Sequence, residues 1–580
     1  MPEEETANRF RKLGVLLLHP ERHKLAILAD YWYDDSIDQL QKEPGIFMKT
    51  IYYNAQVYTG HLPLVEAFIV ESDTFSFVGS TADALALATE EDICVDLEKK
   101  FVCAGFNDSH MHLLSYGNAL NMAPLHEHTG SLEDMIQCLK NHKSTRGGWI
   151  LGRGWNQDYF SDVKRMPNRW DLDRVSTTCP VVAIRTCGHA LVVNSYVLDL
   201  LGISGDIVQP DGGQIVMENG IPNGLFLDNA MNPVYDAIPG PSRDALKDMI
   251  LLACQKLNSY GITSSQSDDY CVFPDLSWQE INAAFQELEA SKKLTVRVNE
   301  QCNFTNLNDL QAFVQAGNTT GAGSTLFRIG PLKLMGDGAL GARTALLSQP
   351  YADSPDSCGI AVFTQDELDA MIGYAHSQGM QVAVHTIGDA CLDRVIAALQ
   401  KAQAEHPRSD HRHGIVHCQI TRADQLVKMA EMALHIYAQT IFLDYDIQIV
   451  EQRVGKQMAS TSYSWKTLEE KGASVSNGSD CPVELPNVLG GIQCAVTRRT
   501  LNGNGPYLPN EAFGVAQALN SFTTGGAYAS FEEHLKGKIK PGMLADFVVL
   551  GDNPFTAVPS SIKDIPVCAT YLGGKKVYSV

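Results

Sequence analysis

Hydrophobic and polar residues alternate over short stretches at both ends of the chain, whereas the middle repeats a different pattern. Residues 48–60, 64–80 and 93–106 are typical of strands whose side chains point to two opposite faces. The same alternation returns in residues 537–554 and 567–580, close to the other end. Because strands from distant parts of a chain can pair in one sheet, we expect the two ends to form a single small β-sandwich.

Between these ends, a buried-looking strand, a polar loop and an amphipathic helix follow one another repeatedly. Helical periodicity is clearest over residues 243–259, 364–378 and 390–406. The strand candidates number eight: 101–110, 261–269, 294–302, 328–338, 381–389, 413–418, 434–442 and 472–480. Strand and helix alternating around eight strands predict an α/β fold, the (β/α)8 TIM barrel with a parallel inner sheet.

One long stretch, residues 113–237, departs from this rhythm directly after the first predicted barrel strand. We interpret it as an insertion that caps the barrel mouth and helps to form a substrate pocket. The predicted organisation is an N-terminal extension of unknown role at 1–47, a composite β-sandwich at 48–103 with 530–580, and the TIM barrel at 104–529.

Bulk properties exclude some classes of partner. The 580 residues are 44% apolar, enough for a large core, and the formal net charge of -22 opposes binding to nucleic acid or to anionic membranes. No stretch approaches the roughly 20 apolar residues that span a bilayer. The 14 cysteines show no CxxC pair, which favours reduced core thiols in the cytoplasm. The oligomeric state is left open, with a homodimer as one alternative.

Two histidines, His110 and His112, end the first predicted barrel strand. Alternate residues of a strand point to the same face, so we expect both imidazoles to project together at its carboxyl end. Two neutral imidazoles on one face can chelate one cation. An isolated His-X-His pair can also consist of ordinary core histidines, so the pair alone does not establish a metal site.

Later barrel strands also end in polar residues, namely Lys333, His385, His417 and Asp480. In a parallel barrel these strand ends converge on one mouth, where such enzymes place their chemistry. Each residue has a structural alternative: a lysine can extend to solvent, a histidine can be satisfied in the core, and an aspartate can cap a helix. Taken together, however, they form a cluster that is difficult to bury unless a cation compensates it.

This order of residues resembles the metal-dependent amidohydrolase superfamily. The stretches GWILGRGWNQ, NRWDLDRVS, GHALVVNS, GPLKLMGDGALGARTALLSQPY, HTIGD and LADFVVL are similar to amidohydrolase family 3, which includes N-substituted formamide deformylases. DGALGARTA together with HTIGD is a specific combination, whereas LADFVVL occurs widely in the superfamily. The resemblance extends from about residue 48 to residue 580.

The resemblance implies a divalent metal centre at the barrel mouth, with zinc as the expected metal. It implies that His110, His112 and Asp480 hold one ion. It also implies that His385 and His417 hold a second ion. Histidine-rich subsites with a carboxylate can also bind iron, manganese or nickel, which remain alternatives.

The resemblance further implies that Lys333 bridges two zinc ions as a carbamate formed with carbon dioxide. A lysine with the usual pKa near 10.4 is protonated and cannot attack carbon dioxide, so neighbouring cations must favour the neutral amine. If Lys333 stays unmodified, we expect a site for one metal only.

The implied reaction is hydrolysis of a non-peptide C–N bond in an amide, a formamide or a cyclic amide. A bound metal lowers the pKa of a coordinated water toward about 7, which gives a hydroxide that attacks the carbonyl. Asp480 would accept the proton of this water and pass it to the leaving nitrogen. The family pattern makes His189 a candidate for hydrogen-bonding the carbonyl or the oxyanion, although it can equally organise its own loop.

Candidate contacts with the substrate follow from the same motifs. Asp337 and Arg343 come directly after the fourth barrel strand, and Arg343 could pair with an acidic group of the substrate or only with Asp337. Trp155 and Tyr159 lie in the predicted insertion, where they would line an apolar pocket or pack within the insertion. The sequence does not identify the small-molecule substrate, because fold alone does not fix function.

Two other classes of function share the predicted site. Members of the superfamily also deaminate rings and cleave esters, so the same residues could serve a deaminase or an esterase. A more distant alternative is a catalytically silent barrel that acts as a binding or regulatory protein. The complete set of candidate ligands argues against the silent barrel, because a decayed enzyme is expected to lose at least one of them.

Overall fold

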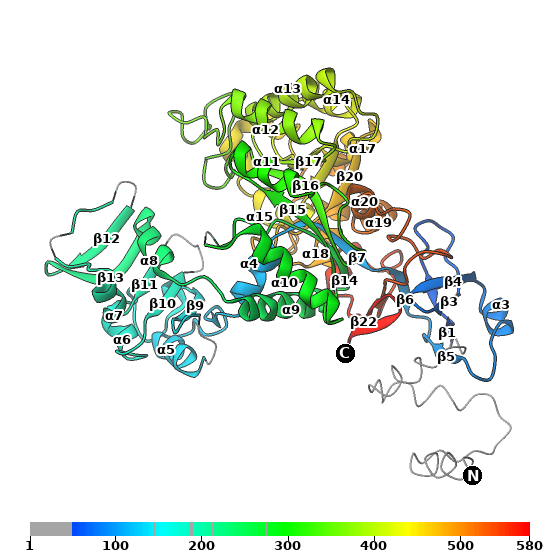
Figure 1. Cartoon of the computed structure of the whole chain (residues 1–580), viewed down its shortest axis with the longest axis horizontal. Helices are drawn as coiled ribbons and strands as arrows, with labels where there is room; N and C mark the ends of the chain where they lie inside the picture. The colour runs from blue at the N-terminus through cyan, green and yellow to red at the C-terminus, as the bar shows by residue number, and fades with distance from the viewer. Residues whose placement is uncertain (1–48, 143–145, 186–189, 206, 211–212, 274) are drawn as a thin grey trace, which may run out of the picture.

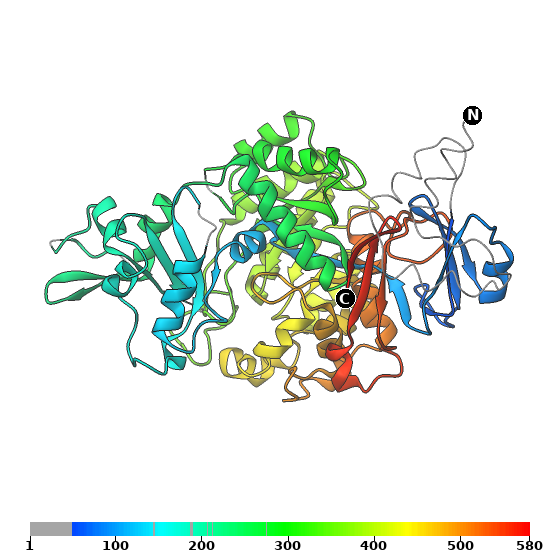
Figure 2. The ribbon, with the colours of Figure 1, turned by 90° about the horizontal axis from the view of Figure 1, so that it is seen from below.

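The computed structural model of the chain describes residues 49–580, apart from 143–145, 186–189, 206, 211–212 and 274. The predicted extension at 1–47 lies outside the described residues. Figures 1 and 2 show three parts side by side: a central barrel, a lobe of strands and helices on one side, and strands from the two chain ends on the other.

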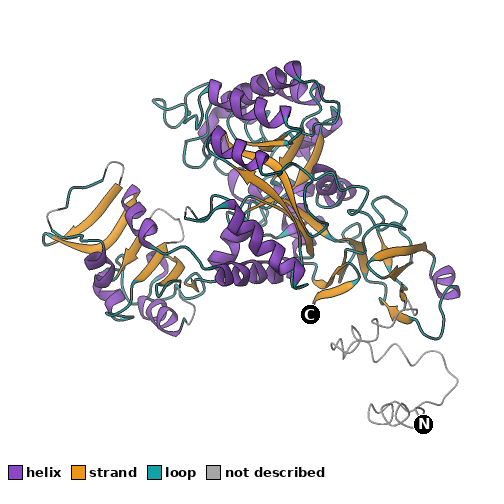
Figure 3. Cartoon of the chain, in the orientation of Figure 1, coloured by secondary structure: helices purple, strands orange, loops and turns teal. Residues whose placement is uncertain are grey.

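The centre of the molecule is a nearly closed barrel of eight parallel strands (Figure 3). Going around the barrel the strands are β7 (Phe106–Met111), β14 (Ile262–Ser267), β15 (Arg297–Asn303), β16 (Phe327–Met335), β17 (Val382–Thr386), β18 (Gly414–His417), β19 (His435–Ala438) and β20 (Ser474–Asn477). Each lies within one predicted strand, or extends it by one residue at an end. The predicted mixed α/β fold with a parallel eight-stranded barrel is therefore confirmed.

Helices on the outside of the barrel follow the strands. They are α4 (Leu113–Leu120), α9 (Arg243–Ser259), α10 (Trp278–Ala290), α11 (Leu307–Gln315), α12 (Gln365–Ser377), α13 (Asp389–Glu405), α14 (Ala423–Glu431), α17 (Trp465–Glu470) and α18 (Val488–Thr497). Polar residues cap several of these helices: the Ser242 hydroxyl accepts the amide of Ala245, and Thr364 forms a capping box with Glu367. The predicted starts of α9, α12 and α13 agree with the structure to within one residue. Polar caps account for the agreement at α9 and α12, whereas α13 follows Gly388 without a side-chain cap.

The segment between α4 and α9 forms a sheet of its own. Its strand order is β12 (Gly213–Glu218), β13 (Ile221–Asp228), β11 (Ala190–Val193), β10 (Val181–Arg185), β9 (Ile150–Trp155) and β8 (Ala123–Pro124). It also contains α5 (Leu132–Asn141), α6 (Arg169–Asp173), α7 (Ser195–Leu200) and α8 (Asn232–Ala237). An insertion after the first barrel strand is thus present as a lobe (Figure 1), and its role as a cap stays a prediction.

The chain ends form two further sheets, and the second of them contains strands from both ends. One has the order β4 (Thr74–Gly79), β3 (Ala67–Glu71), β1 (Lys49–Tyr53) and β5 (Ile93–Asp96), with α3 (Thr81–Ala86) beside it. The other has the order β2 (Gln56–Val57), β6 (Phe101–Ala104), β21 (Phe547–Leu550), β22 (Val567–Leu572) and β23 (Lys575–Ser579). Their common core is aromatic, with ring centroids 4.9 Å apart for Phe68 and Phe547 and 4.2 Å apart for Phe547 and Tyr571.

The predicted strand 101–110 is two strands in the structure, because it changes sheets at Gly105. β6 belongs to the sheet of the chain ends and β7 to the barrel. A Cβ atom at Gly105 would lie 2.2 Å from Oγ1 of Thr263, so only glycine fits this crossing point. The apolar run predicted the strands but not the break between them.

A buried ion pair ties the barrel to the sheet of the chain ends. The guanidinium of Arg297 on β15 makes two hydrogen bonds, of 2.6 and 2.9 Å, to the carboxylate of Asp546. Asp546 also accepts the amide of Gly573. Both side chains are less than a tenth exposed, and these hydrogen bonds compensate the two charges for the loss of water.

No helix of the described residues is both long and apolar enough to cross a membrane.

Two short helices, α15 (Leu443–Asp446) and α16 (Val450–Ala459), follow β19, and α19 (Val515–Ser521) and α20 (Thr524–Ala529) follow α18. The first pair lies after the carboxyl end of a strand. α20 instead contacts the amino half of the barrel, where the amide of Gln381, which precedes β17, donates to the carbonyl of Ala529. The barrel therefore has a floor near α20 and a mouth at the carboxyl ends of its strands.

Candidate metal centre

The seam between the first and last barrel strands brings two predicted ligands together. The amide of Asp480 donates to the carbonyl of His110 at 2.8 Å, and the amide of Ser479 donates to the carboxylate of Asp108 at 3.0 Å. These bonds continue the barrel from β20 to β7. As a result, residues that are 370 positions apart along the chain face each other at the mouth.

Two side chains at this seam, together with His417 at the end of β18, could hold a metal ion. Single ligand atoms of His110, His417 and Asp480 all lie within 4.8 Å of one another, and all three residues are buried. Nε2 of His110 is 3.3 Å from Oδ1 of Asp480, and Nε2 of His112 is 3.1 Å from the same oxygen. The side chain of His112 is one quarter exposed, so this edge of the cluster faces the opening of the barrel.

The other two predicted ligands adjoin this cluster. The imidazole of His385 lies 4.5 Å, centroid to centroid, from that of His417. Lys333 is fully buried, and its Nζ is 3.3 Å from Oδ2 of Asp268, a residue just beyond the end of β14. The structure therefore places all six predicted ligands at one mouth, as neighbours, while their roles as ligands stay predictions.

The electrostatics of the cluster favour metal ligation by three of the histidines. Burial, with the nearby Lys333 charge, lowers the pKa of His110 and lowers that of His385 to about 3. Burial likewise lowers the pKa of His417 well below its usual range. These three imidazoles are therefore neutral at neutral pH, and neutral imidazole is the form that binds metals.

His112 and Asp480 form a coupled pair within the same cluster. Burial opposes the charge on His112, but the hydrogen bond and negative charge of Asp480 outweigh it and raise the pKa of His112 to about 9. Burial also opposes the charge on Asp480, whereas hydrogen bonds from His110 and His112 hold its pKa well below the usual range. Asp480 is therefore ionised at neutral pH, and a metal that binds here must displace a proton from His112.

Backbone strain coincides with this cluster. His417 and Asp480 both have positive φ angles, 73° and 57°. A left-handed conformation at a residue other than glycine costs on the order of 1–3 kcal/mol and persists where the surrounding structure enforces it. Such residues gather at functional sites, which supports a functional role for the barrel mouth.

Buried polar residues that the sequence analysis did not single out hold these side chains in place. Oε1 of Gln301 lies 2.7 Å from Nδ1 of His110, and Oε1 of Gln439 lies 2.8 Å from Nδ1 of His417. The carbonyl of Asp268 accepts from Nδ1 of His112 at 3.0 Å. The available signal was a polar side chain near the end of an otherwise apolar strand, which does not reveal its partner on another strand.

The residues predicted to contact the substrate have other partners here. Asp337 accepts the amides of Leu346, Ile387 and Gly388 and so shapes the loops after β16 and β17. Arg343 pairs with Asp353 through two hydrogen bonds of 3.0 and 2.9 Å, so the suggested Arg343–Asp337 pair does not form.

The aromatic candidates lie in the inserted lobe. Trp155 is fully buried in the core of that lobe, with its indole N–H donating to the carbonyl of Ala183. Tyr159 is two-thirds exposed. His189 lies outside the described residues. Substrate contacts by all these residues stay predictions.

Acidic side chains lie beside the cluster at the mouth. Burial and the negative charges of Asp444, Asp446 and Asp480 raise the pKa of Glu484 to about 7. Burial also raises the pKa of Asp446 to about 6, although Tyr463 and Gln419 donate hydrogen bonds to it. The mouth therefore carries groups that change charge near neutral pH.

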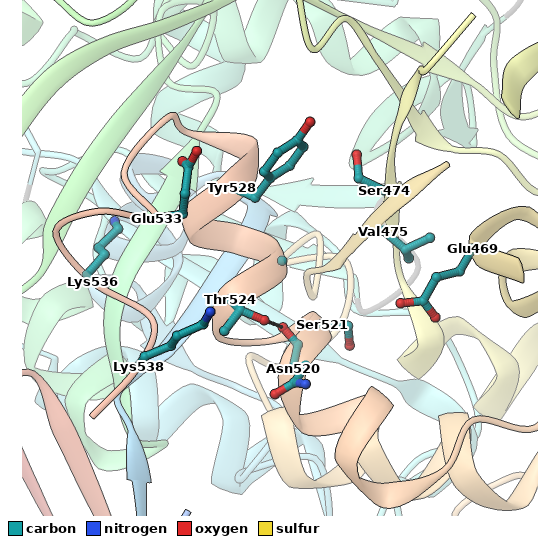
Figure 4. A pocket seen from close by; sticks show the side chains of 11 residues that line it. Glu469, Ser474, Val475, Asn520, Ser521, Thr524, Tyr528, Glu533, Lys536 and Lys538 are labelled. Atoms are coloured by element: carbon teal, nitrogen blue, oxygen red, sulfur yellow. Dashed lines mark hydrogen bonds between the residues drawn. The ribbon is translucent and has the colours of Figure 1, made fainter. Parts of the chain in front are cut away.

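A separate cavity of about 360 Å³ opens at the other end of β20. Figure 4 shows its lining, which includes Ser474 at the start of β20, Thr524 of α20, and Lys536 and Lys538 after α20. Lys536 forms an ion pair with Glu532. The cavity lies on the floor side of the barrel, so it is distinct from the cluster of histidines at the mouth.

Comparison with known proteins agrees with this geometry. Residues 94–578 match the amidohydrolase family. The chain belongs to the amidohydrolase family. Amidohydrolase YtcJ of Bacillus subtilis (strain 168) is 32% identical over 544 residues, which cover 92% of this chain and 99% of that protein. N-substituted formamide deformylase of Arthrobacter pascens is 23% identical over 525 residues, which cover 88% of this chain and 94% of that protein.

A solved structure is similar over the same range. The crystal structure of an uncharacterized metal-dependent hydrolase from Pyrococcus furiosus has a TM-score of 0.74 and 29% sequence identity, and the match covers 88% of this chain and all of that one. The resemblance to amidohydrolases seen in the sequence is thus confirmed. This amidohydrolase is a metal-dependent hydrolase of its family, with a possible ligand group of His110, His417 and Asp480.

Proposed function

We propose that this amidohydrolase cleaves the non-peptide C–N bond of a small amide, a formamide or a cyclic amide at the barrel mouth. The observation that carries the proposal is the convergence of His110, His417 and Asp480 within 4.8 Å, with His112 on the same carboxylate oxygen. A buried group of imidazoles around an ionised carboxylate is difficult to explain as packing alone.

The donor set fits a divalent metal. Imidazole nitrogen and carboxylate oxygen are the usual ligands of Zn²⁺, and three of the imidazoles are neutral here. When bound, a divalent cation supplies Lewis acidity that polarises a carbonyl and lowers the pKa of water. His110, His112 and Asp480 would hold one such ion.

A second ion is part of the proposal. Nε2 of His385 lies 3.1 Å from the carbonyl of Gly338, which can only accept a hydrogen bond, so Nε2 carries the hydrogen and the lone pair of the neutral ring is on Nδ1. His385 and His417 would hold this ion. Lys333 would bridge both ions as a carbamate, and the carbamate would then replace the present contact between Lys333 and Asp268.

Asp480 would carry the proton in this reaction. Both contacts to its neighbouring imidazoles use Oδ1, and within the described part of the chain Oδ2 has no hydrogen bond. The ionised carboxylate would take a proton from water at Oδ2 and release it to the nitrogen of the leaving amine. Such a transfer contributes about 10²–10⁴-fold to a rate.

The name of one relative suggests where to begin the search for a substrate. The Arthrobacter protein is named for N-substituted formamides, so we propose this class as the first to test. An N-substituted formamide releases formate and a primary amine, and both products are simple to measure.

The decisive experiment combines metal content with a panel of substrates. Protein stripped with a chelator and reloaded with Zn²⁺, Fe²⁺ or Mn²⁺ is assayed with N-substituted formamides, acetamides, cyclic amides, aryl esters and aminopurines. We expect amine release from at least one amide class, lost after stripping and restored by metal. Ammonia release from aminopurines, or acid release from esters alone, would contradict the proposed bond. Hydrolysis that is unchanged in stripped protein would contradict the metal-dependent site.

A further inference from the structure

Two buried glutamines make the same pair of contacts on different barrel strands. Gln301 lies on β15, and Gln439 directly follows β19; neither side chain is exposed. The amide nitrogen of Gln301 donates to the carbonyl of Ser109 at 3.1 Å, and that of Gln439 donates to the carbonyl of Tyr437 at 2.9 Å. In both, the amide oxygen meets Nδ1 of a histidine, His110 or His417.

These contacts determine which way each amide faces. A backbone carbonyl can only accept a hydrogen bond, so the NH₂ group must point at it and the amide oxygen must point at the imidazole. An amide oxygen can only accept, so Nδ1 of the histidine carries the hydrogen. The lone pair of a neutral imidazole is then on Nε2.

The free Nε2 atoms point into the predicted metal site. Nε2 of His110 is 3.3 Å from Oδ1 of Asp480. His417 belongs to the same group of ligand atoms within 4.8 Å. With Nδ1 already engaged by Gln439, the nitrogen that His417 can offer there is Nε2.

We propose that Gln301 and Gln439 are positioning residues that fix His110 and His417 as Nδ1–H tautomers with Nε2 available to a metal. The inference rests on the proposed metal-dependent function and names residues that act through the ligands. Hydrogen-bond partners of metal-binding histidines typically contribute 10- to 100-fold to metal affinity. A glutamine supplies this contact without adding a negative charge to the buried site.

The test measures Zn²⁺ affinity of the full-length protein, without any substrate. Chelator-stripped wild type, Gln301→Leu and Gln439→Leu are titrated with Zn²⁺ against a competing dye, and thermal melting reports folding. We expect each leucine variant to bind Zn²⁺ about 10- to 100-fold more weakly. Gln301→Glu and Gln439→Glu keep an oxygen opposite Nδ1, and a protonated carboxyl also keeps a donor to the backbone carbonyl that each glutamine NH₂ contacts. We therefore expect both glutamate variants to recover affinity relative to leucine when this carboxyl is protonated.

Gln381 provides a matched control. It is as buried as the two positioning residues, but it lies near the barrel floor and its amide donates to the carbonyl of Arg412. Gln381→Leu should lower the melting temperature and leave Zn²⁺ affinity unchanged. The proposal would be overturned if Gln381→Leu lost as much Zn²⁺ affinity as Gln301→Leu and Gln439→Leu at the same loss of thermal stability. It would also be overturned if Gln301→Leu and Gln439→Leu both folded and bound Zn²⁺ with wild-type affinity.

The outcomes also separate this inference from the proposed function. Tight Zn²⁺ binding that depends on Gln301 and Gln439, without hydrolysis of any amide, would support the inference and count against the proposed reaction. Amide hydrolysis, together with a Zn²⁺ affinity that does not change when either glutamine is replaced, would support the proposed reaction and count against the inference. A folded wild type that binds no divalent metal would overturn both.

Discussion

Replacing Asp480 with asparagine tests the proposed proton carrier with little change of shape. The carboxylate meets Nε2 of His110 at 3.3 Å and Nε2 of His112 at 3.1 Å, both through Oδ1, and leaves Oδ2 available. Asparagine keeps one oxygen for these contacts but has no charge and cannot accept a proton. We therefore expect kcat to fall by about 10²–10⁴-fold. At about 1.36 kcal/mol for each factor of ten, this is about 2.7–5.4 kcal/mol of transition-state stabilisation.

The assay follows release of the amine from the best substrate of the panel, together with metal content and thermal melting. Asp480→Asn is expected to retain part of the metal, because the histidines remain. Asp369→Asn is a control for the same exchange on an outer helix, where Asp369 pairs with Lys401 at the surface, and it should leave kcat unchanged. A rate of Asp480→Asn within tenfold of wild type, at equal metal content, would refute the role of proton carrier.

Three further changes have defined expected outcomes. Lys333→Ala should lower metal content from two ions toward one and regain part of it with added short carboxylic acids; unchanged stoichiometry by metal analysis would exclude a bridging carbamate. The pKa of Glu484 is raised to about 7, so its carboxyl is protonated below that pH and negative above it. The pH profile of kcat/KM should therefore show a transition near pH 7 that Glu484→Gln removes. If the transition persists in this variant, it belongs to another group. Asp546→Asn leaves the buried Arg297 charge without its carboxylate and should destabilise the protein by about 3–5 kcal/mol in chemical denaturation, and a change below 1 kcal/mol would contradict the importance of that ion pair.

The barrel could be predicted because its signals are local. Each inner strand is a buried run next to a polar loop, and long helices such as α9 and α12 have an apolar face and a polar cap, Ser242 or Thr364. The strands of the insertion were not predicted. Gly213–Glu218 is only partly buried and carries no clear alternation. Val181–Arg185 and Ala190–Val193 are buried apolar runs so short that periodicity does not distinguish a strand from a helix. The break at Gly105 depends on close contact with Thr263 of another strand, which no local pattern reveals.

The site was predictable as a set of residues but not as a set of contacts. Polar residues at strand ends, together with the family resemblance, pointed to the six candidate ligands. Contacts between different strands pair Lys333 with Asp268 and Gln301 with His110. The local sequence around one of these residues therefore does not show which partner it has. Trp155 shows the same limit, because an aromatic residue in a pocket and one in a core have the same local sequence pattern.

The most direct test of the central claim is a crystal structure of metal-loaded protein with anomalous diffraction data measured at the metal absorption edge. We expect an anomalous peak at the barrel mouth, bonded to His110 and Asp480 at about 2.0–2.2 Å, the usual range for zinc with nitrogen and oxygen ligands. A peak elsewhere, or these two side chains pointing apart with no metal between the strands, would contradict it.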